Sequence, residues 1–167
     1  MKVVFVTHYT KMYGANRSLL NLLTGIRSKK IRPYVLSPAE GELTEHLSNE
    51  DINYYTLPFR KWMGRERWKA PARLAINLSS LIPLTIKVKE WSPDLIYTNT
   101  SVTPIGALLA EILSLPHIWH IREFGDLDYN LSYDWGEHNF YKLTSRSSAA
   151  IAVSHAVKNH ILKEISI

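Results

Sequence analysis

The sequence predicts an α/β fold in which helices cover both faces of a parallel sheet. Six short apolar segments alternate along the chain with six segments whose apolar residues recur at three- and four-residue spacing. This alternation favours right-handed crossovers between parallel strands, and ligands of such sheets bind beyond the carboxyl ends of the strands. A length of 167 residues and a hydrophobic content of 46% suit a single domain with one core.

The predicted strands are short runs rich in β-branched and aromatic residues, which pack well on a pleated surface. The first run opens the chain, and the last precedes the final predicted helix. The six predicted strands are Lys2–Thr7, Pro33–Ser37, Tyr54–Leu57, Leu95–Thr98, His117–Ile121 and Ala149–Val153.

The predicted helices fill most of the gaps between these strands. Gly14 stands just before the first helix, and Ser154 suits the N-cap of the last. No capping glycine or further element follows before Ile167, so we expect a domain boundary there. The six predicted helices are Ala15–Ser28, Leu43–Asn49, Ala70–Glu90, Pro104–Leu113, Gly136–Ser145 and His155–Lys163.

The turn after the first strand indicates a binding site. A strand that passes through Gly14 and Ala15 into a helix directs unpaired backbone N–H groups and the positive end of the helix dipole at one point. An anionic ligand such as a diphosphate is stabilised by that arrangement. The chain therefore begins like a nucleotide-handling domain.

Composition excludes several classes of protein. Cysteine is absent, so disulfides and thiolate metal sites are excluded, and a reducing cytoplasmic setting is expected. No segment approaches the ~20 apolar residues that span a bilayer. The apolar run at the start is assigned to the core instead of a signal peptide. We expect a soluble or peripheral protein in the cytoplasm.

The net charge of +5 is concentrated in a basic stretch around residues 60–73. Such clustering favours an anionic partner, which could be lipid headgroups, a phosphorylated substrate or nucleic acid. No nucleic-acid recognition motif accompanies the basic residues, so no nucleic-acid partner is expected.

Residues 59–69 interleave tryptophans with cations, and the pattern fits two interpretations. In one, the segment contacts the inner face of a membrane, with aromatic rings among the headgroups and cations beside anionic lipid. In the other, it is a solvated loop whose tryptophans fold onto the sheet. The membrane contacts expected under the first interpretation are Trp62, Arg65, Arg67 and Trp68.

Four segments occur in a set order that covers nearly the whole chain. They are Gly14–Leu20, Asp94–Ser101, Leu115–Glu123 and Ala149–Val157. Together they resemble the N-terminal, acceptor-side domain of the GT-B glycosyltransferases, specifically the retaining group called family 4. The resemblance implies a Rossmann-like domain. It also implies that the C-terminal domain, which binds most of the nucleotide sugar, is absent from this chain, and that this fragment alone is inactive.

The resemblance extends to individual residues. Gly14 and Ala15 match the turn whose backbone approaches the donor diphosphate, although Tyr13 stands where many members have a second glycine. His120 matches the histidine beside the transferred sugar, within His-Ile-Arg-Glu in place of the usual His-Asp, and is the expected catalytic residue. The side chains expected at the acceptor are His8, Asn99, Arg122 and Glu123.

The expected donor is a nucleotide-diphosphate sugar, with no tightly bound cofactor. No metal is expected, because Asp126, Asp128 and Asp134 are irregularly spaced and similar enzymes generally manage the diphosphate charge without one. The implied function is retaining transfer of a hexose-type sugar to a glycan or lipid-linked acceptor, in glycan, polysaccharide or glycolipid synthesis. The alternative is a non-catalytic module that holds a membrane or glycan through residues 59–69.

Overall fold

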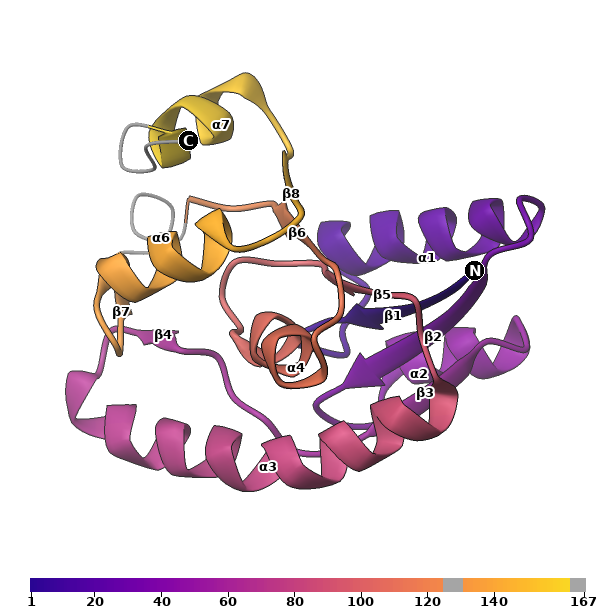
Figure 1. The fold of residues 1–167 in the computed structure, drawn as a ribbon, viewed down its shortest axis with the longest axis horizontal. Helices are drawn as coiled ribbons and strands as arrows, with labels where there is room; N and C mark the ends of the chain where they lie inside the picture. Colours follow the sequence, from indigo (N-terminus) through magenta and orange to yellow (C-terminus); the bar gives the residue numbers. More distant parts are fainter. Residues whose placement is uncertain (125–130, 163–167) are drawn as a thin grey trace.

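A six-stranded parallel sheet with helices on both faces forms the centre of the computed structural model, which describes residues 1–124 and 131–162 (Figure 1). Its strands are β1 (Lys2–Val6), β2 (Arg32–Ser37), β3 (Asn53–Thr56), β5 (Leu95–Thr98), β6 (His117–Ile121) and β8 (Ala149–Ala152). They lie in the order β3-β2-β1-β5-β6-β8, and every pairing is parallel. The order reverses between β1 and β5, where α/β sheets open a crevice for ligands.

The first two helices pack on one face of the sheet, and the next two pack on the other face. The longer ones are α1 (Gly14–Arg27), α2 (Glu42–Asn49), α3 (Ala70–Trp91), α4 (Ile105–Leu113), α6 (Glu137–Ser145) and α7 (His155–Leu162). On β1, Val3 and Phe5 pack with α1 and α2, whereas Val4 and Val6 pack with α3 and α4. Strands buried on both faces must be apolar throughout, which explains the continuous apolar run that opens the chain.

A small aromatic layer extends the core beyond the end of the sheet. It contains an antiparallel ribbon of β4 (Met63–Gly64) and β7 (Ser132–Tyr133) together with α6 (Figure 1). Trp62, Trp119 and Phe140 form its buried centre. A short 3₁₀ helix, η1 (Arg67–Lys69), then leads into α3. This layer brings the segment between β3 and α3 to the carboxyl edge of the sheet.

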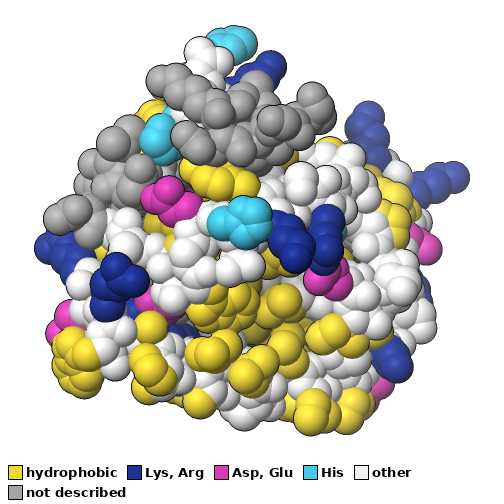
Figure 2. All heavy atoms as spheres, turned by 60° about the vertical axis from the view of Figure 1, so that its left-hand side comes forward, with side chains coloured by type: hydrophobic (Ala, Val, Ile, Leu, Met, Phe, Trp, Pro, Cys, Tyr) yellow, Lys and Arg dark blue, Asp and Glu magenta, His cyan; other side chains and the backbone are white. Residues whose placement is uncertain are grey.

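The predicted strands and helices are confirmed, with bounds that differ by one residue at most within the described part of the chain. The ribbon of β4 and β7 and the helix η1 were not predicted. Lys163, Asp126 and Asp128 lie outside the described residues. Across residues 1–124 and 131–162, no helix is long and apolar enough to cross a bilayer. Figure 2 shows hydrophobic side chains along the lower part of the surface, where α3 lies.

Candidate functional site

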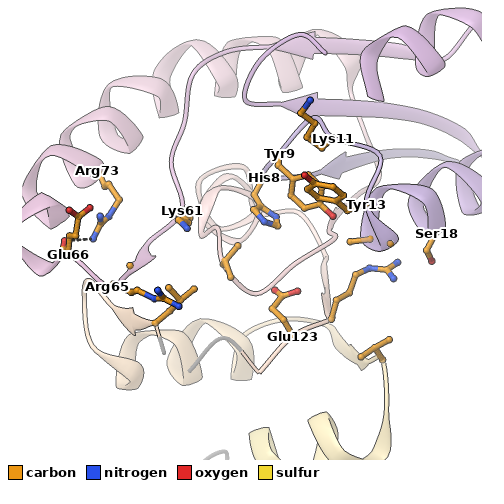
Figure 3. A pocket seen from close by; sticks show the side chains of 17 residues that line it. His8, Tyr9, Lys11, Tyr13, Ser18, Lys61, Arg65, Glu66, Arg73 and Glu123 are labelled. Atoms are coloured by element: carbon orange, nitrogen blue, oxygen red, sulfur yellow. Dashed lines mark hydrogen bonds between the residues drawn. The ribbon is translucent and has the colours of Figure 1, made fainter. Parts of the chain in front are cut away.

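A cavity of about 1170 Å³ opens at the carboxyl ends of the strands (Figure 3). Its walls come from the β1–α1 turn, the first turns of α1, the segment between β3 and α3, and the residues that follow β6. The lining residues are His8, Tyr9, Lys11, Tyr13, Gly14, Ala15, Ser18, Lys61, Gly64, Arg65, Glu66, Arg73, Val102, Arg122, Glu123, Leu131 and Val153. The predicted position of the site, beyond the strand ends, therefore holds a large cavity.

Asn16 fixes the turn that leads into α1. Its side-chain amide donates to the carbonyl oxygens of Tyr9 and Lys11, both at 2.9 Å, and its Oδ1 accepts from Thr7 at 2.8 Å. The side chain is fully buried. This role was not predicted from the sequence, because Asn16 lies inside the helix while its side chain forms hydrogen bonds with residues of the preceding turn. The start of α1 is thereby held rigidly at the cavity.

The N-terminus of α1 faces the cavity without a cap from a side chain. Tyr13 occupies the N-cap position and makes no side-chain cap bond, and the first turn contains no acidic residue. A Cβ built on Gly14 would meet no atom within 4 Å. Packing within the described chain does not require glycine here, and the backbone is open to a ligand at the positive end of the helix dipole.

Asn99 connects this helix to the end of β6. Its Nδ2 donates to the carbonyl oxygen of Ala15 at 3.2 Å, and its Oδ1 accepts from Nε of Arg122 at 2.9 Å. The side chain is 1% exposed and does not line the cavity. The predicted acceptor contact of Asn99 stays a prediction, and in this structure both ends of its amide bond to other residues of the protein. Asn99 positions Arg122, which does line the cavity.

Glu123 is held at the cavity by three donors. Its Oε1 accepts from Thr100 Oγ1 at 2.7 Å, from the Ser101 backbone N–H at 2.6 Å and from Ser101 Oγ at 2.8 Å. These donors follow β5, the neighbouring strand, so the carboxylate is fixed by the sheet edge. Figure 3 shows it directed into the cavity opposite His8.

His8 stands in the middle of the cavity wall, between Lys61 on one side and Tyr9 and Tyr13 on the other (Figure 3). Its Nδ1 is buried and has no hydrogen-bond partner within the described residues. Burial, reinforced by the positive charge of Lys61, lowers the pKa of His8 to about 3. The imidazole is therefore neutral at physiological pH, and its ring lines the cavity, where a ligand can contact it.

His120, the predicted catalytic residue, is absent from the residues that line this cavity. Its Nδ1 lies 2.5 Å from the hydroxyl of Tyr97, and burial together with the charge of Arg122 lowers its pKa to about 4. His117 points to the opposite face of β6, where it bonds Thr98 and Ser147. The catalytic role of His120 stays a prediction, while its neighbours Arg122 and Glu123 reach the cavity.

Trp62 does not face a membrane, so this part of the prediction is wrong. The side chain is 1% exposed, its Nε1 donates to the carbonyl oxygen of Ser101 at 2.9 Å, and its ring stacks on Trp119. The interpretation in which the tryptophan folds onto the sheet applies here. Trp68, on η1, is 76% exposed, and Arg67 beside it is also exposed. Arg65 is exposed and lines the cavity.

The cavity carries an excess of positive charge. Its basic lining residues are Lys11, Lys61, Arg65, Arg73 and Arg122, and its acidic ones are Glu66 and Glu123. Lys11 pairs with Glu42 at 3.2 Å, and Arg73 forms a buried two-point pair with Asp134. The five basic lining residues against two acidic ones, together with the open helix terminus, suit an anionic ligand.

The described residues hold no group of three histidine or acidic side chains placed to bind a metal. Asp134, one of the three irregularly spaced acids, is occupied by Arg73. Asp126 and Asp128 lie in the stretch that the structure does not describe.

The sequence of the chain matches a known protein family. Residues 12–167 match the family described as Glycosyltransferase Family 4. No curated protein matches the chain in sequence.

Comparison with solved structures gives the same fold at low identity. HepE of Anabaena in complex with UDP-glucose superposes with a TM-score of 0.70 at 22% identity, over 98% of this chain and 40% of that one. MnaA of S. aureus with UDP gives 0.65 at 15%, over 98% and 40%. The UDP-GlcNAc 2-epimerase of Neisseria meningitidis bound to UDP-GlcNAc gives 0.64 at 16%, over 98% and 43%. The chain thus spans less than half the length of these proteins. Because an epimerase shares the fold, architecture alone does not distinguish a transferase.

Proposed function

The chain belongs to glycosyltransferase family 4, and we propose that it is the acceptor-side domain of a nucleotide-sugar-dependent retaining glycosyltransferase. The observation that carries the proposal is the shared cavity. The open N-terminus of α1, at Gly14 and Ala15, lines the same cavity as Arg122 and Glu123. An anion-binding helix terminus beside fixed polar side chains suits a diphosphate leaving group next to a sugar hydroxyl.

The donor end of the cavity is the start of α1. There the backbone N–H groups of the first helical turn would stabilise the departing diphosphate, an electrostatic contribution that needs no covalent intermediate. The solved structures of HepE with UDP-glucose and MnaA with UDP support a nucleotide sugar as the partner. A second α/β domain would close the cleft and bind the rest of the donor.

The acceptor end is formed by His8, Arg122 and Glu123. Thr100 and Ser101 fix Glu123, so its carboxylate is preorganised to accept a hydrogen bond from the hydroxyl group of the acceptor. The neutral imidazole of His8 lines the cavity opposite Glu123 and can contact the same ligand. In this scheme His120 acts on the cavity indirectly, through its contact with the Tyr97 hydroxyl and its proximity to the charge of Arg122. Closure of the cleft would be needed to bring its imidazole to the sugar.

Chemically, the acceptor oxygen forms a bond to the anomeric carbon while the bond from that carbon to the β-phosphate oxygen breaks. The acceptor proton leaves with the diphosphate. We place the acceptor among glycans and lipid-linked sugars at the cytoplasmic face of a membrane, which the positive charge around the cavity favours.

The experiment measures nucleoside diphosphate released by the full-length protein from a panel of UDP-hexoses, with a membrane lipid extract as the source of acceptor. Glu123→Gln is expected to reduce release at least about tenfold, because it removes a fixed charge at the acceptor. Glu137→Gln, at an exposed residue of α6, is the matched control and should keep wild-type activity. Absence of release from every donor, with binding to vesicles retained, would favour the non-catalytic module instead.

A further inference from the structure

The outer surface of α3 carries an apolar stripe. Leu78 is 54% exposed, Ile82 71% and Ile86 57%, and these three residues follow one another at four-residue spacing. We call them the α3 outer stripe. Towards the start of the helix the stripe continues through two further exposed apolar residues, Pro71 and Ala75.

This exposure is unusual for a helix that also packs against a core. The inner side of α3 contributes Leu84 and Val88 to the buried cluster under the sheet. A surface helix ordinarily presents polar residues on its outer side, and a helix that is apolar all round is usually covered. Of the nine large apolar side chains exposed in the described chain, four lie on η1 and α3, namely Trp68, Leu78, Ile82 and Ile86. Such a concentration marks an interaction surface.

The charges around the stripe have one predominant sign. Residues 60–90 include eight lysines and arginines, and no carboxylate stands between residues 67 and 89. Of these cations, Lys61, Arg65 and Arg73 line the cavity, and Lys69 and Lys87 pair with Glu66 and Glu90. The exposed side chains of Arg67 and Lys89 flank the two ends of the stripe. An apolar surface bordered by cations complements a layer whose interior is hydrocarbon and whose surface is negative.

We propose that Trp68, the α3 outer stripe, Arg67 and Lys89 form a face that docks on an anionic lipid bilayer. This docking goes beyond the proposed transfer reaction and does not depend on it. The helix lies along the membrane surface, with the isoleucines among the upper acyl chains and the ring of Trp68 at headgroup level. The face takes the place of the contact predicted for Trp62, which is buried.

The placement of this face also orients the cavity. Arg73 of α3 and Glu66, just before η1, both line the cavity, so the cavity adjoins the N-terminal end of the docked helix (Figure 3). A lipid-linked acceptor would reach His8 and Glu123 without leaving the membrane surface. A peripheral domain can thus act on a substrate whose lipid remains in the bilayer.

Vesicle flotation of the 167-residue chain tests the docking. We expect flotation with vesicles of phosphatidylcholine mixed with phosphatidylglycerol, and none with phosphatidylcholine alone. The Ile82→Ser/Ile86→Ser variant should bind the mixed vesicles at least about tenfold more weakly, because it removes apolar area from the contact. Ile112→Ser is the matched control, since Ile112 is 53% exposed but lies on α4, and it should bind like the wild type.

A second pair of variants tests the charge. Arg67→Glu and Lys89→Glu should each weaken binding by about fivefold or more, and added salt should weaken wild-type binding in the same direction. Lys29→Glu, at an exposed residue beyond the end of α1, should leave binding unchanged. Circular dichroism of each variant confirms that the fold is retained.

Two kinds of result, from vesicle binding and from light scattering, would overturn the proposal. One is binding that is equal for neutral and anionic vesicles, or that is unaffected by the serine substitutions in a folded chain. The other is a dimer, detected by light scattering, that the Ile82→Ser/Ile86→Ser variant converts to a monomer, because the stripe would then be covered by a second copy. Neither result bears on sugar transfer, so failure here is distinct from failure of the proposed function.

Discussion

Arg122 donates from its Nε to Oδ1 of Asn99 over 2.9 Å, and this bond joins the ends of the neighbouring strands β5 and β6. The other end of the Asn99 amide donates to the carbonyl oxygen of Ala15 in the first turn of α1. One buried side chain thus ties together the two walls on which the proposed donor and acceptor groups lie. The relative position of those walls depends on Asn99.

We predict that Asn99→Ala lowers the free energy of unfolding by about 1–2 kcal/mol, because the substitution leaves buried polar groups without partners. Activity of the full-length protein should fall more than stability alone explains, since Arg122 loses its orientation. Asn99→Asp keeps an acceptor for Arg122 but removes the donor to Ala15, and it should retain more activity. Urea denaturation and diphosphate release measure the two effects. Equal activity in Asn99→Ala and the wild type would contradict this role.

The two tryptophans at either end of the basic segment should differ sharply in their contribution to stability. Trp62 is buried against Trp119, Tyr133 and Phe140, so Trp62→Ala should cost about 3–5 kcal/mol through the loss of packing and the cavity that remains. Trp68→Ala removes a side chain that is 76% exposed and should change stability by less than about 0.5 kcal/mol. Urea denaturation of both variants checks the prediction, and comparable losses would contradict the assignment of Trp62 to the core.

The buried pair between Arg73 and Asp134 connects α3 to the segment after β7. Its side chains are 13% and 2% exposed, and hydrogen bonding and charge from Asp134 raise the pKa of Arg73. Asp134→Ala should destabilise the fold by about 3 kcal/mol, because a partly buried guanidinium is left without its partner. The double variant Arg73→Met/Asp134→Leu should recover much of that loss in urea denaturation. Equal instability of the single and double variants would show that packing, not charge, holds this contact.

Most of the sheet and its helices could be predicted from the sequence, because each element is long enough to show its own periodicity. The ribbon of β4 and β7 could not, since two residues per strand show no alternation and Met63 pairs with Tyr133, far along the chain. The burial of the Trp62 side chain could not be predicted from the sequence either. A tryptophan among cations is typical of a surface, and the ring cluster that buries it comes from distant segments.

The position of the candidate site followed from the strand ends, but the roles of its side chains did not. Asn99 is withdrawn from the cavity by hydrogen bonds to residues on two other segments. The buried turn contacts of Asn16 likewise depend on how the chain folds back on itself. The sequence pattern places a residue near the carboxyl edge of the sheet. Whether its side chain reaches a ligand depends on the hydrogen-bond partners that other segments of the folded chain bring to it.

Gly14 and Gly25 provide a matched pair for testing the start of α1. A Cβ on either glycine would meet no atom of the described residues within 4 Å, and both glycines lie in the same helix. Alanine at either position should raise stability by up to about 1 kcal/mol, through helix propensity and a less flexible unfolded chain. Gly14→Ala alone should reduce diphosphate release by the full-length protein, by about tenfold, because its methyl group occupies space at the proposed phosphate site. Unchanged release in Gly14→Ala, with the same stability gain, would remove Gly14 from the donor site.

Stability should fall as the pH is lowered, and His8 should contribute measurably to the fall. Burial lowers the pKa of His8 to about 3 in the folded chain, and the pKa values of His117 and His120 to about 4, from 6.5 in the unfolded chain. Between these values the unfolded chain binds protons that the folded chain does not, so the free energy of unfolding decreases as the pH falls through that range.

His8→Leu removes one of these groups, together with its Nδ1, which has no hydrogen-bond partner among the residues that the structure describes. The difference in unfolding free energy between about pH 7.5 and about pH 5 should therefore be smaller in the variant than in the wild type, by roughly 1–2 kcal/mol. Urea denaturation at the two pH values measures this difference, and carboxylates that titrate in both proteins cancel in the comparison. An identical pH dependence in the two proteins would mean that His8 takes up its proton as readily in the folded chain as in the unfolded one, and the neutral imidazole proposed for the acceptor end of the cavity would be lost with it.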